Sequence, residues 1–283
     1  MPELPEVESV RRQLAPELTG RRVVAVWWDP HPNTRLSDLD LVVGRRVEAV
    51  RRRGKFLLCS LDPTADGDHL ELVLHLGMTG SLSFTRPSPA PDAGHDRDPT
   101  VGHVRVRFEL DDGRTLRFRD PRRFGRASVV PAQDYADRIP TLARLGPEPL
   151  SAEFDADRFA AALAATTAPV KARLLDQRLV AGVGNIYADE ALWRAGIHPG
   201  SRRVGRGRGL RLHARLVEVL AAAVEREGTT FRDYQMINGQ SGRYAAHLDA
   251  YGQAELPCRR CGRTLRRTVI AQRGTTYCPG CQH

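Results

Sequence analysis

Residues 174–196 read LLDQRLVAGVGNIYADEALWRAG, and this stretch decides the fold of the second half of the chain. Apolar residues recur at helical spacing on both sides of AGVGN, whereas Gly182 and Gly184 interrupt the pattern. We predict a helix over 169–180, a tight turn, and a second helix over 186–196. The second helix begins with unpaired N–H groups at Asn185 and Ile186, which favours phosphate binding, although glycines also end helices without any ligand.

Helical sequence continues on either side of this stretch, and β-rich sequence precedes it. DADRFAAALAAT (155–166) and RLHARLVEVLAAAVEREG (211–228) predict helices, the second closed by Gly228. Short strands are predicted between residues 20 and 130, with a hairpin turn at DDG (111–113), and so many short strands indicate a β-sandwich. The strand candidates are RRVVAVWW, LVVGRRVEAV, KFLLCSL, LELVLHLGM, SLSF, HVRVRFEL and TLRFRD.

These patterns predict an α+β multidomain protein. We expect an N-terminal β-sandwich domain with a capping N-terminal helix at 1–130, a linker at 131–150, a helical domain at 151–250 and a zinc ribbon at 251–283. The Pro/Asp/Gly-rich stretch RPSPAPDAGHDRDP (86–99) is predicted to be a loop of unassigned role.

Cysteines mark the C-terminus as a metal site. Four of the five cysteines form a C-x2-C-x16-C-x2-C pattern, a spacing that presents four thiolates to one tetrahedral zinc. Because four cysteines leave no open position, we expect a structural ion; two disulfides are the alternative. The pattern consists of Cys258, Cys261, Cys278 and Cys281, while the fifth residue, Cys59, lies in an apolar strand and is expected to be a core thiol.

The charge of the chain indicates a polyanionic partner. Forty-three Lys and Arg face 34 Asp and Glu, a formal net charge of +9, although a high-GC genome also enriches Arg. There is no apolar run near the roughly 20 residues of a membrane span and no secretory leader, so we expect a cytoplasmic location.

The N-terminus, MPELPEVESV, is unusual in its two prolines and three carboxylates. A small residue after Met1 favours removal of the methionine, which would leave Pro2 as a secondary amine beside Glu3. Pro5 and the acidic residues Glu6 and Glu8 indicate a helix start, and an ordinary helix N-terminus is the alternative interpretation. An apolar stripe that would dock this helix on a core consists of Val7, Val10, Leu14 and Leu18.

Two turn-bounded segments, LHLGMTG and DPRRFGR, each offer an apolar or aromatic side chain. Met78 lies among glycines, a poor setting for a core residue, and Arg122 and Phe124 lie in the second segment. Core packing is the default for such residues, but they can also fill the space left when a nucleotide leaves a duplex stack.

Seven motifs follow one another along the chain: PELPEVE, RRGKFLL, HLGMTGSL, DPRRFG, LGPEPL, LLDQRLVAGVGNIYADEALWRAGIHP with GTTFRDY, and the ribbon with AQRGTTYCPGC. In this order they resemble the bacterial formamidopyrimidine-DNA glycosylases, the Fpg/MutM branch of the Fpg/Nei family. The likeness covers the whole chain and implies a helix-two-turns-helix in the helical domain.

The resemblance implies a bifunctional DNA glycosylase and AP lyase of base excision repair. It would excise oxidised purines, 8-oxoguanine and formamidopyrimidines, through a Schiff base at Pro2, followed by β- and δ-elimination. Glu3 is the implied acid/base partner, Lys55 is associated with β-elimination and Arg273 with δ-elimination. The implied cofactor is one structural zinc, and the implied partner is damaged double-stranded DNA, bound by a monomer.

Further residues are implied to contact DNA. The segment 229–244 matches the loop that closes over the damaged purine. Phosphate contacts are expected from Lys55, His75, Asn185 and Arg273, and Lys171 is assigned to the phosphates or their surroundings. Stack-filling contacts are expected from Met78, Arg122 and Phe124, with Arg122 facing the orphaned base. A retained contact is expected from His103, where the family shows a KHDH-like run and this chain has TVGH.

Two departures and two rivals accompany this interpretation. Basic residues usual in the family are missing at Val101 and Thr166, so the resemblance does not carry two secondary DNA contacts over to this chain, although it still carries the chemistry. A Nei-type enzyme for oxidised pyrimidines is the nearest rival, and PELPEVE with Met78, Arg122 and Phe124 favours the purine branch. A catalytically silent zinc-ribbon DNA-binding protein is the rival from another class, and its discriminator is a retained Met1.

Overall fold

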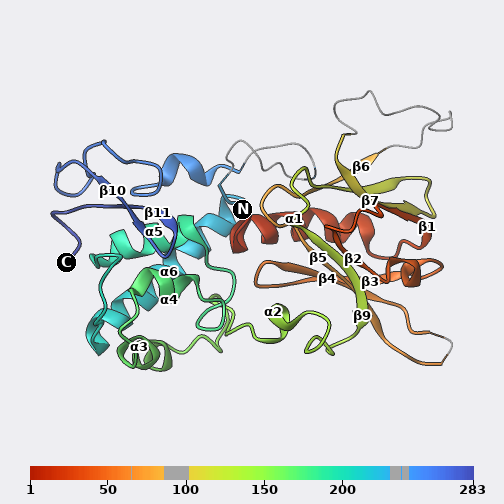
Figure 1. The fold of residues 1–283 in the computed structure, drawn as a ribbon, viewed down its shortest axis with the longest axis horizontal. Coiled ribbons are helices and arrows are strands. Elements are labelled where there is room, and N and C mark those ends of the chain that lie inside the picture. The colour runs from red at the N-terminus through yellow and green to blue at the C-terminus, as the bar shows by residue number, and fades with distance from the viewer. Residues whose placement is uncertain (65, 86–101, 230–236, 238–241) are drawn as a thin grey trace. The chain divides into compact units, whose positions relative to one another are not determined.

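The structure, a computed structural model, describes residues 1–64, 66–85, 102–229, 237 and 242–283 (Figure 1). Its contacts divide the chain into two units. The first unit contains Met1–Pro2, Glu6–Ala143 and Thr230–Gly242, and the second contains Glu3–Pro5, Arg144–Thr229 and Arg243–His283. The predicted loop at 86–99, Val101 and most of the predicted lesion-covering segment at 229–244 lie outside the described residues.

The first unit is built on two sheets. The four-stranded sheet has the order β1-β7-β8-β6, with β1 Val23–Trp28, β7 Val104–Leu110, β8 Thr115–Arg119 and β6 Ser81–Thr85. The five-stranded sheet has the order β2-β9-β5-β4-β3, with β2 Arg35–Ser37, β9 Arg126–Pro131, β5 Leu70–His75, β4 Phe56–Leu61 and β3 Val47–Arg53. Two short helical elements complete the unit, η1 Leu39–Val42 and α2 Pro140–Ala143.

Both sheets contribute to one apolar core. Leu57 and Leu74 of the five-stranded sheet share it with Phe108 and Phe118 of the four-stranded sheet. Helix α1, Leu4–Leu18, adds the predicted stripe of Val7, Val10, Leu14 and Leu18 to the same core. The predicted β-sandwich with its capping helix is confirmed, as is the hairpin turn at 111–113, where Gly113 has φ +80°.

One strand prediction is wrong in its bounds. LVVGRRVEAV forms no single strand, because its first residues belong to the 3-10 helix η1 and only Val47 onward pairs in β3. Gly44, at φ +81°, separates the two, a conformation that a glycine reaches at little cost. The sequence patterns predicted neither strand β2 nor strand β9.

The second unit is helical and ends in a ribbon. Its elements are α3 Ala156–Ala164, α4 Val170–Leu175, α5 Asn185–Ala195, α6 Arg206–Glu225, η2 Tyr244–His247, β10 Arg266–Ile270 and β11 Arg273–Tyr277. Helix α6 begins five residues before the predicted start, and it packs on α3 through Gly209, where a Cβ would lie 2.8 Å from Ala160. In the described part of the chain, no helix combines the length and the apolarity needed to cross a bilayer.

The predicted helix over 169–180 ends at Leu175, because Gln177 organises a turn in place of further helix. Its Nε2 donates to the Val183 carbonyl at 2.8 Å and its Oε1 accepts from the Gly182 N–H at 2.9 Å. One side chain thus ties together the two turns between α4 and α5. The predicted helix-two-turns-helix is confirmed, with a shorter first helix.

Candidate active site and nucleic-acid interface

The start of helix α5 holds the carboxylate of Glu3. Glu3 is buried, its Oε1 accepts from the Ile186 N–H at 2.9 Å, and its Oε2 accepts from the Tyr187 N–H at 3.4 Å. A helix N-terminus offers free N–H groups and a positive dipole end, an arrangement suited to a carboxylate. The prediction that Ile186 cradles a phosphate is therefore wrong, since a side chain of the protein occupies that N–H group.

Both glycines of the AGVGN turn make room for the N-terminal segment. A Cβ at Gly184 would lie 2.3 Å from Cδ of Glu3, and one at Gly182 would lie 2.7 Å from Cβ of Leu4. The Leu4 N–H also donates to the Gly182 carbonyl at 3.0 Å. The predicted nucleophile, Pro2, is buried and directly precedes this fixed carboxylate in the chain.

Lys171 is buried among oxygen atoms of the protein. Its side chain has 0% exposure and its Nζ lies 2.6 Å from Oδ1 of Asp189, which is equally buried. The same Nζ donates to Thr275 Oγ1 at 2.7 Å and to the Gly274 carbonyl at 3.2 Å. These oxygen atoms hold the ammonium inside the second unit. The DNA-binding role of Lys171 stays a prediction.

Lys171 and Asn185 together hold the turn of the ribbon. Asn185 Nδ2 donates to the Gly274 carbonyl at 2.9 Å, the same oxygen that Lys171 contacts. The turn places Ala271 at φ +49° and Gln272 at φ +59°, the backbone of a tight two-residue hairpin. Arg273 follows it and is exposed. The phosphate roles of Asn185 and Arg273 stay predictions.

Electrostatic interactions link these groups. Burial lowers the pKa of Lys171, while Asp189 and Glu3 act in the opposite direction and Arg273 lowers it further. Burial raises the pKa of Asp189 to about 6, against the effect of Lys171. The second unit thus brings together the predicted site residues Glu3, Lys171, Asn185 and Arg273.

In the first unit, His75 closes strand β5 beside Phe56 of β4, whose ring centroid lies 4.6 Å from the imidazole centroid. Its Nδ1 accepts from the Gly77 N–H at 3.1 Å, so in the neutral ring Nε2 carries the proton. Burial lowers the pKa of His75 to about 4, and the charges of Lys55, Arg126 and Arg35 add to that effect. The neutral His75 ring can therefore donate a hydrogen bond from Nε2–H to a DNA phosphate.

We expect His75 to stay neutral across the physiological pH range. Because its folded pKa of about 4 lies below the usual 6.5, the neutral ring contributes stability that is present above pH 6.5 and is lost as the pH falls through 4. Imidazole nitrogen NMR should show the Nε2–H form down to about pH 5. The difference in unfolding free energy between wild type and His75→Gln should shrink on acidification. A ring that titrates near pH 6.5 would contradict this assignment.

The loops that carry Met78 and Phe124 are packed against each other. A Cβ at Gly77, which has φ +64°, would lie 2.6 Å from the Gly125 nitrogen. The Arg122 guanidinium lies 4.7 Å from the centroid of the Phe124 ring, and Phe124 is 44% exposed. An exposed, preformed Arg–Phe pair is suited to insertion into a base stack.

Asp120, which the sequence interpretation missed, joins the two loops. Its buried carboxylate accepts from Thr79 Oγ1 at 2.6 Å, the Arg122 N–H at 3.2 Å and the Gly125 N–H at 2.7 Å. An Asp that ends a strand before Pro is a turn signal, but its partner across the chain carried no sequence signal.

His103 and Lys55 are the remaining predicted residues of this unit. His103 is exposed at φ +72°, and its carbonyl accepts from the Asp120 N–H at 2.9 Å. Lys55 is buried, follows Gly54 in the turn between β3 and β4, and acts electrostatically on His75. The roles of both residues stay predictions.

Replacing Asp120 by Asn should loosen the paired loops. The amide would present N–H groups to one of the backbone donors, so we expect the free energy of unfolding to fall by about 1–3 kcal/mol. Discrimination between bases opposite the lesion should fall with it. The control is Asp112→Asn in the β7–β8 turn, where the carboxylate lies nearer the surface and pairs with Arg114 and Arg21. Equal effects of both changes in urea unfolding would contradict the role of Asp120.

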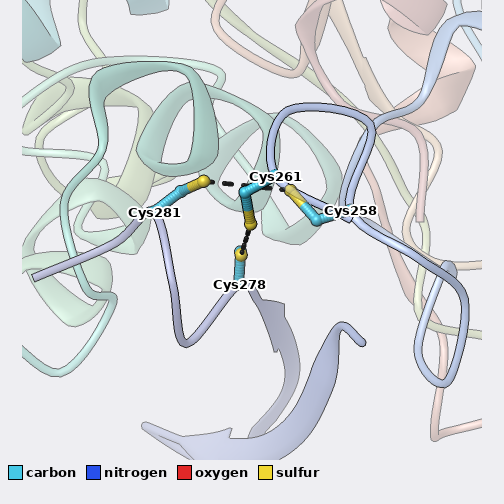
Figure 2. A group of neighbouring side chains, drawn as sticks. All are labelled: Cys258, Cys261, Cys278 and Cys281. Atoms are coloured by element: carbon cyan, nitrogen blue, oxygen red, sulfur yellow. Dashed lines mark hydrogen bonds between the residues drawn. The ribbon is translucent and has the colours of Figure 1, made fainter. Parts of the chain in front are cut away.

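The four predicted metal ligands converge at the base of the ribbon (Figure 2). Their sulfurs lie within 4.8 Å of one another, with Cys261 and Cys278 at 3.5 Å and Cys258 and Cys281 at 4.0 Å. Tetrahedral bonds of ~2.3 Å require sulfurs ~3.8 Å apart, so the donor set fits zinc. The Arg260 N–H donates a hydrogen bond to the Cys258 sulfur, and the Gly280 N–H donates one to the Cys278 sulfur, each at 3.4 Å. Such hydrogen bonds stabilise the thiolate form that binds a metal.

Removal of zinc should unfold the ribbon, because its apolar core is small. That core contains Trp193, Ala250 and Leu265 besides two of the cysteines. Chelation or Cys278→Ser should remove amide-exchange protection from β10 and β11 while leaving the sandwich protected, and should abolish DNA binding. Adding zinc back to the chelated wild type is the control. Full protection of the ribbon in demonstrably zinc-free protein would contradict a structural ion.

Three family models match the chain in sequence order. They are described as "Formamidopyrimidine-DNA glycosylase N-terminal domain" over residues 1–127, "Formamidopyrimidine-DNA glycosylase H2TH domain" over 145–235 and "Zinc finger found in FPG and IleRS" over 255–283. The third match identifies the metal as zinc, so the predicted cofactor is confirmed. The predicted domain boundaries stay predictions.

Curated relatives and solved structures agree with these matches. The formamidopyrimidine-DNA glycosylases of Deinococcus radiodurans and Thermus thermophilus are 44% and 46% identical over the whole chain, covering 97% and 98% of their own lengths. The crystal structure of MutM (Fpg) from Thermus thermophilus matches with a TM-score of 0.86 at 46% identity, covering 99% of this chain and 98% of that one. Lactococcus lactis Fpg in complex with abasic-site DNA matches with a TM-score of 0.85 at 31% identity, covering 99% of each chain. The chain therefore belongs to the formamidopyrimidine-DNA glycosylase family.

Proposed function

We propose that this protein is a bifunctional DNA glycosylase and AP lyase of base excision repair. Its substrates would be oxidised purines, chiefly 8-oxoguanine and formamidopyrimidines, in duplex DNA. The names of its relatives support the glycosylase activity, and solved structures of the Lactococcus lactis protein contain Fapy-dG or abasic-site DNA. The same names favour the purine branch over the rival enzyme for oxidised pyrimidines.

The observation that carries this proposal is the carboxylate of Glu3. The N–H groups of Ile186 and Tyr187 hold it, and Glu3 is the residue that directly follows Pro2 in the chain. An acid/base group must stay within reach of the proton that it moves. A silent DNA-binding protein has no need to bury a carboxylate at this position or to keep a glycine at 184 for it.

The chemistry of the amine explains the use of a terminal proline. A lysine near pKa 10.4 is almost wholly protonated at pH 7, whereas an α-amine near 7.7–8.0 keeps roughly a tenth in the neutral form. Removal of Met1 would free the nitrogen of Pro2. The proposal therefore requires that the mature chain begin at Pro2.

The reaction would proceed through one covalent intermediate. The Pro2 nitrogen would attack the sugar C1′, the bond from C1′ to the base would break, and the base would leave with the bonding electrons and take up a proton from water. The amine proton would pass to the Glu3 carboxylate, which would then protonate the ring oxygen O4′ as the C1′–O4′ bond breaks and the iminium between Pro2 and C1′ forms. The resulting iminium withdraws electrons, so loss of the C2′ proton breaks the C3′–O bond. Loss of the C4′ proton then breaks the C5′–O bond. Lys55 is proposed to assist the first elimination and Arg273 the second.

Zinc takes no part in these steps. Four cysteines fill its coordination shell, so its proposed task is to shape the ribbon that presents Arg273. Phosphate contacts by His75, Asn185 and Arg273, and stack filling by Met78, Arg122 and Phe124, would hold the duplex around the vacated site.

Borohydride trapping tests the nucleophile. Enzyme mixed with 8-oxoguanine duplex should give a stable protein–DNA adduct, and peptide mapping should place it on Pro2 of a chain without Met1. Glu3→Gln should lower base excision about 10²- to 10⁴-fold, since the amide cannot take up a proton. Glu17→Gln is the matched control, because Glu17 is an exposed carboxylate late in α1. An adduct on Lys55 with unmodified Pro2 would overturn the mechanism.

A further inference from the structure

One end of the five-stranded sheet carries two arginines in register with the neutral His75. The register pairs Arg35 of β2 with Arg126 of β9, Arg126 with His75 of β5, and His75 with Phe56 of β4. Cross-strand partners point to the same face of a sheet. Arg35, Arg126 and His75 therefore share one face at one end of three neighbouring strands, and Lys55 lies next to Phe56.

This face points away from the sandwich core. The neighbouring register row consists of Leu36, Ala127, Leu74 and Leu57, of which the last three lie in the core and Leu36 packs against it. Because successive residues of a strand alternate between faces, the row of Arg35, Arg126 and His75 lies on the opposite side. Packing of the core therefore does not explain two arginines at this position.

Neither arginine has an acidic partner in the described chain. No carboxylate among the described residues forms an ion pair with Arg35 or Arg126, whereas other arginines of the first unit, such as Arg51, Arg52 and Arg105, are paired. Partial burial lowers the pKa of Arg126, and the charge of Arg35 lowers it further, which shows that the two charges repel. Without an anion this arrangement costs free energy.

We infer that Arg35 and Arg126 form an anion-binding row, continuous with His75, that binds consecutive phosphodiester groups of one DNA strand. The inference rests on the proposed function. Strands are spaced about 4.8 Å apart, so the row spans about 10 Å across three strands, and the long arginine side chains can reach neighbouring phosphates of one strand from it. Arginine suits this task, since its planar fork matches phosphate geometry and its charge persists when the pKa falls.

The test measures the salt dependence of DNA binding. Wild type, Arg35→Gln, Arg126→Gln and the double variant are titrated with a duplex that carries a non-cleavable tetrahydrofuran site, and with undamaged duplex of the same sequence. Each lost phosphate contact should reduce the slope of log K against log salt by about 0.9, and the double variant should lose about 1.8. The loss should be the same on both duplexes, because phosphates carry no information about damage.

Two further variants distinguish phosphate binding by the row from a general effect of positive charge and from an effect of side-chain packing. Arg45→Gln removes the same charge at the opposite end of the sheet, beside Pro63 and beyond the Val47–Leu61 pair, and should keep the wild-type slope. Arg126→Lys should restore most of the slope lost in Arg126→Gln. Thermal unfolding without DNA at low salt should show no loss of stability in Arg126→Gln, because one of two repelling charges is gone.

The outcomes distinguish the inference from the proposed function. Wild-type protein that binds neither duplex would reject the proposed function itself. Wild-type binding combined with unchanged slopes in Arg35→Gln and Arg126→Gln would reject the row alone. Failure of Arg126→Lys to restore the slope, or loss of slope in Arg45→Gln as well, would also reject it. Excision from a saturated complex should change less than about threefold, since the row binds but does not react.

Discussion

The hydrogen bonds from the start of α5 to the Glu3 carboxylate are the constraint on which the second unit depends. They fix the N-terminal segment, and they require glycine at 184, because any side chain there would collide with Glu3. The Gly182 carbonyl adds a backbone bond to Leu4. A turn that resembles an anion-binding loop in sequence is thus used to hold an internal carboxylate beside the proposed nucleophile.

The same helix also holds the C-terminal ribbon, through two consecutive acids. Asp189 accepts from the Thr276 N–H at 3.0 Å, and Glu190 accepts from the N–H groups of Asp249, Ala250 and Tyr251 at 2.8–2.9 Å. Both carboxylates are fully buried, and burial raises both pKa values while these bonds work against it. Buried carboxylates persist where backbone donors satisfy them. Helix α5 therefore links the first residues of the chain to the zinc ribbon.

The sequence predicted what local pattern determines, and it missed what partners distant in the chain determine. Alternation and helical spacing predicted the sandwich, α1 and α5, and cysteine spacing predicted the zinc ligands. Lys171 was predicted only as a DNA-binding residue, and its partners Asp189 and Thr275, which hold it in the interior, carried no signal in the sequence. Asp120 and Arg126 went unnoticed for the same reason, since only their neighbours on other strands give them a role.

The distribution of acids explains where the excess positive charge of the first unit can act. Some of its carboxylates are paired with arginines: Asp29 binds Arg105 and Arg123, and Glu8 binds Arg11 and Arg52. The charge of a paired arginine is largely compensated by its carboxylate partner, so it attracts an anionic ligand only weakly. An arginine that has no such partner and lies next to another cation attracts anions strongly. The formal charge of +9 is therefore a weaker guide to DNA binding than the position of individual cations. In the first unit the sheet register puts Arg35 and Arg126 next to the neutral donor of His75.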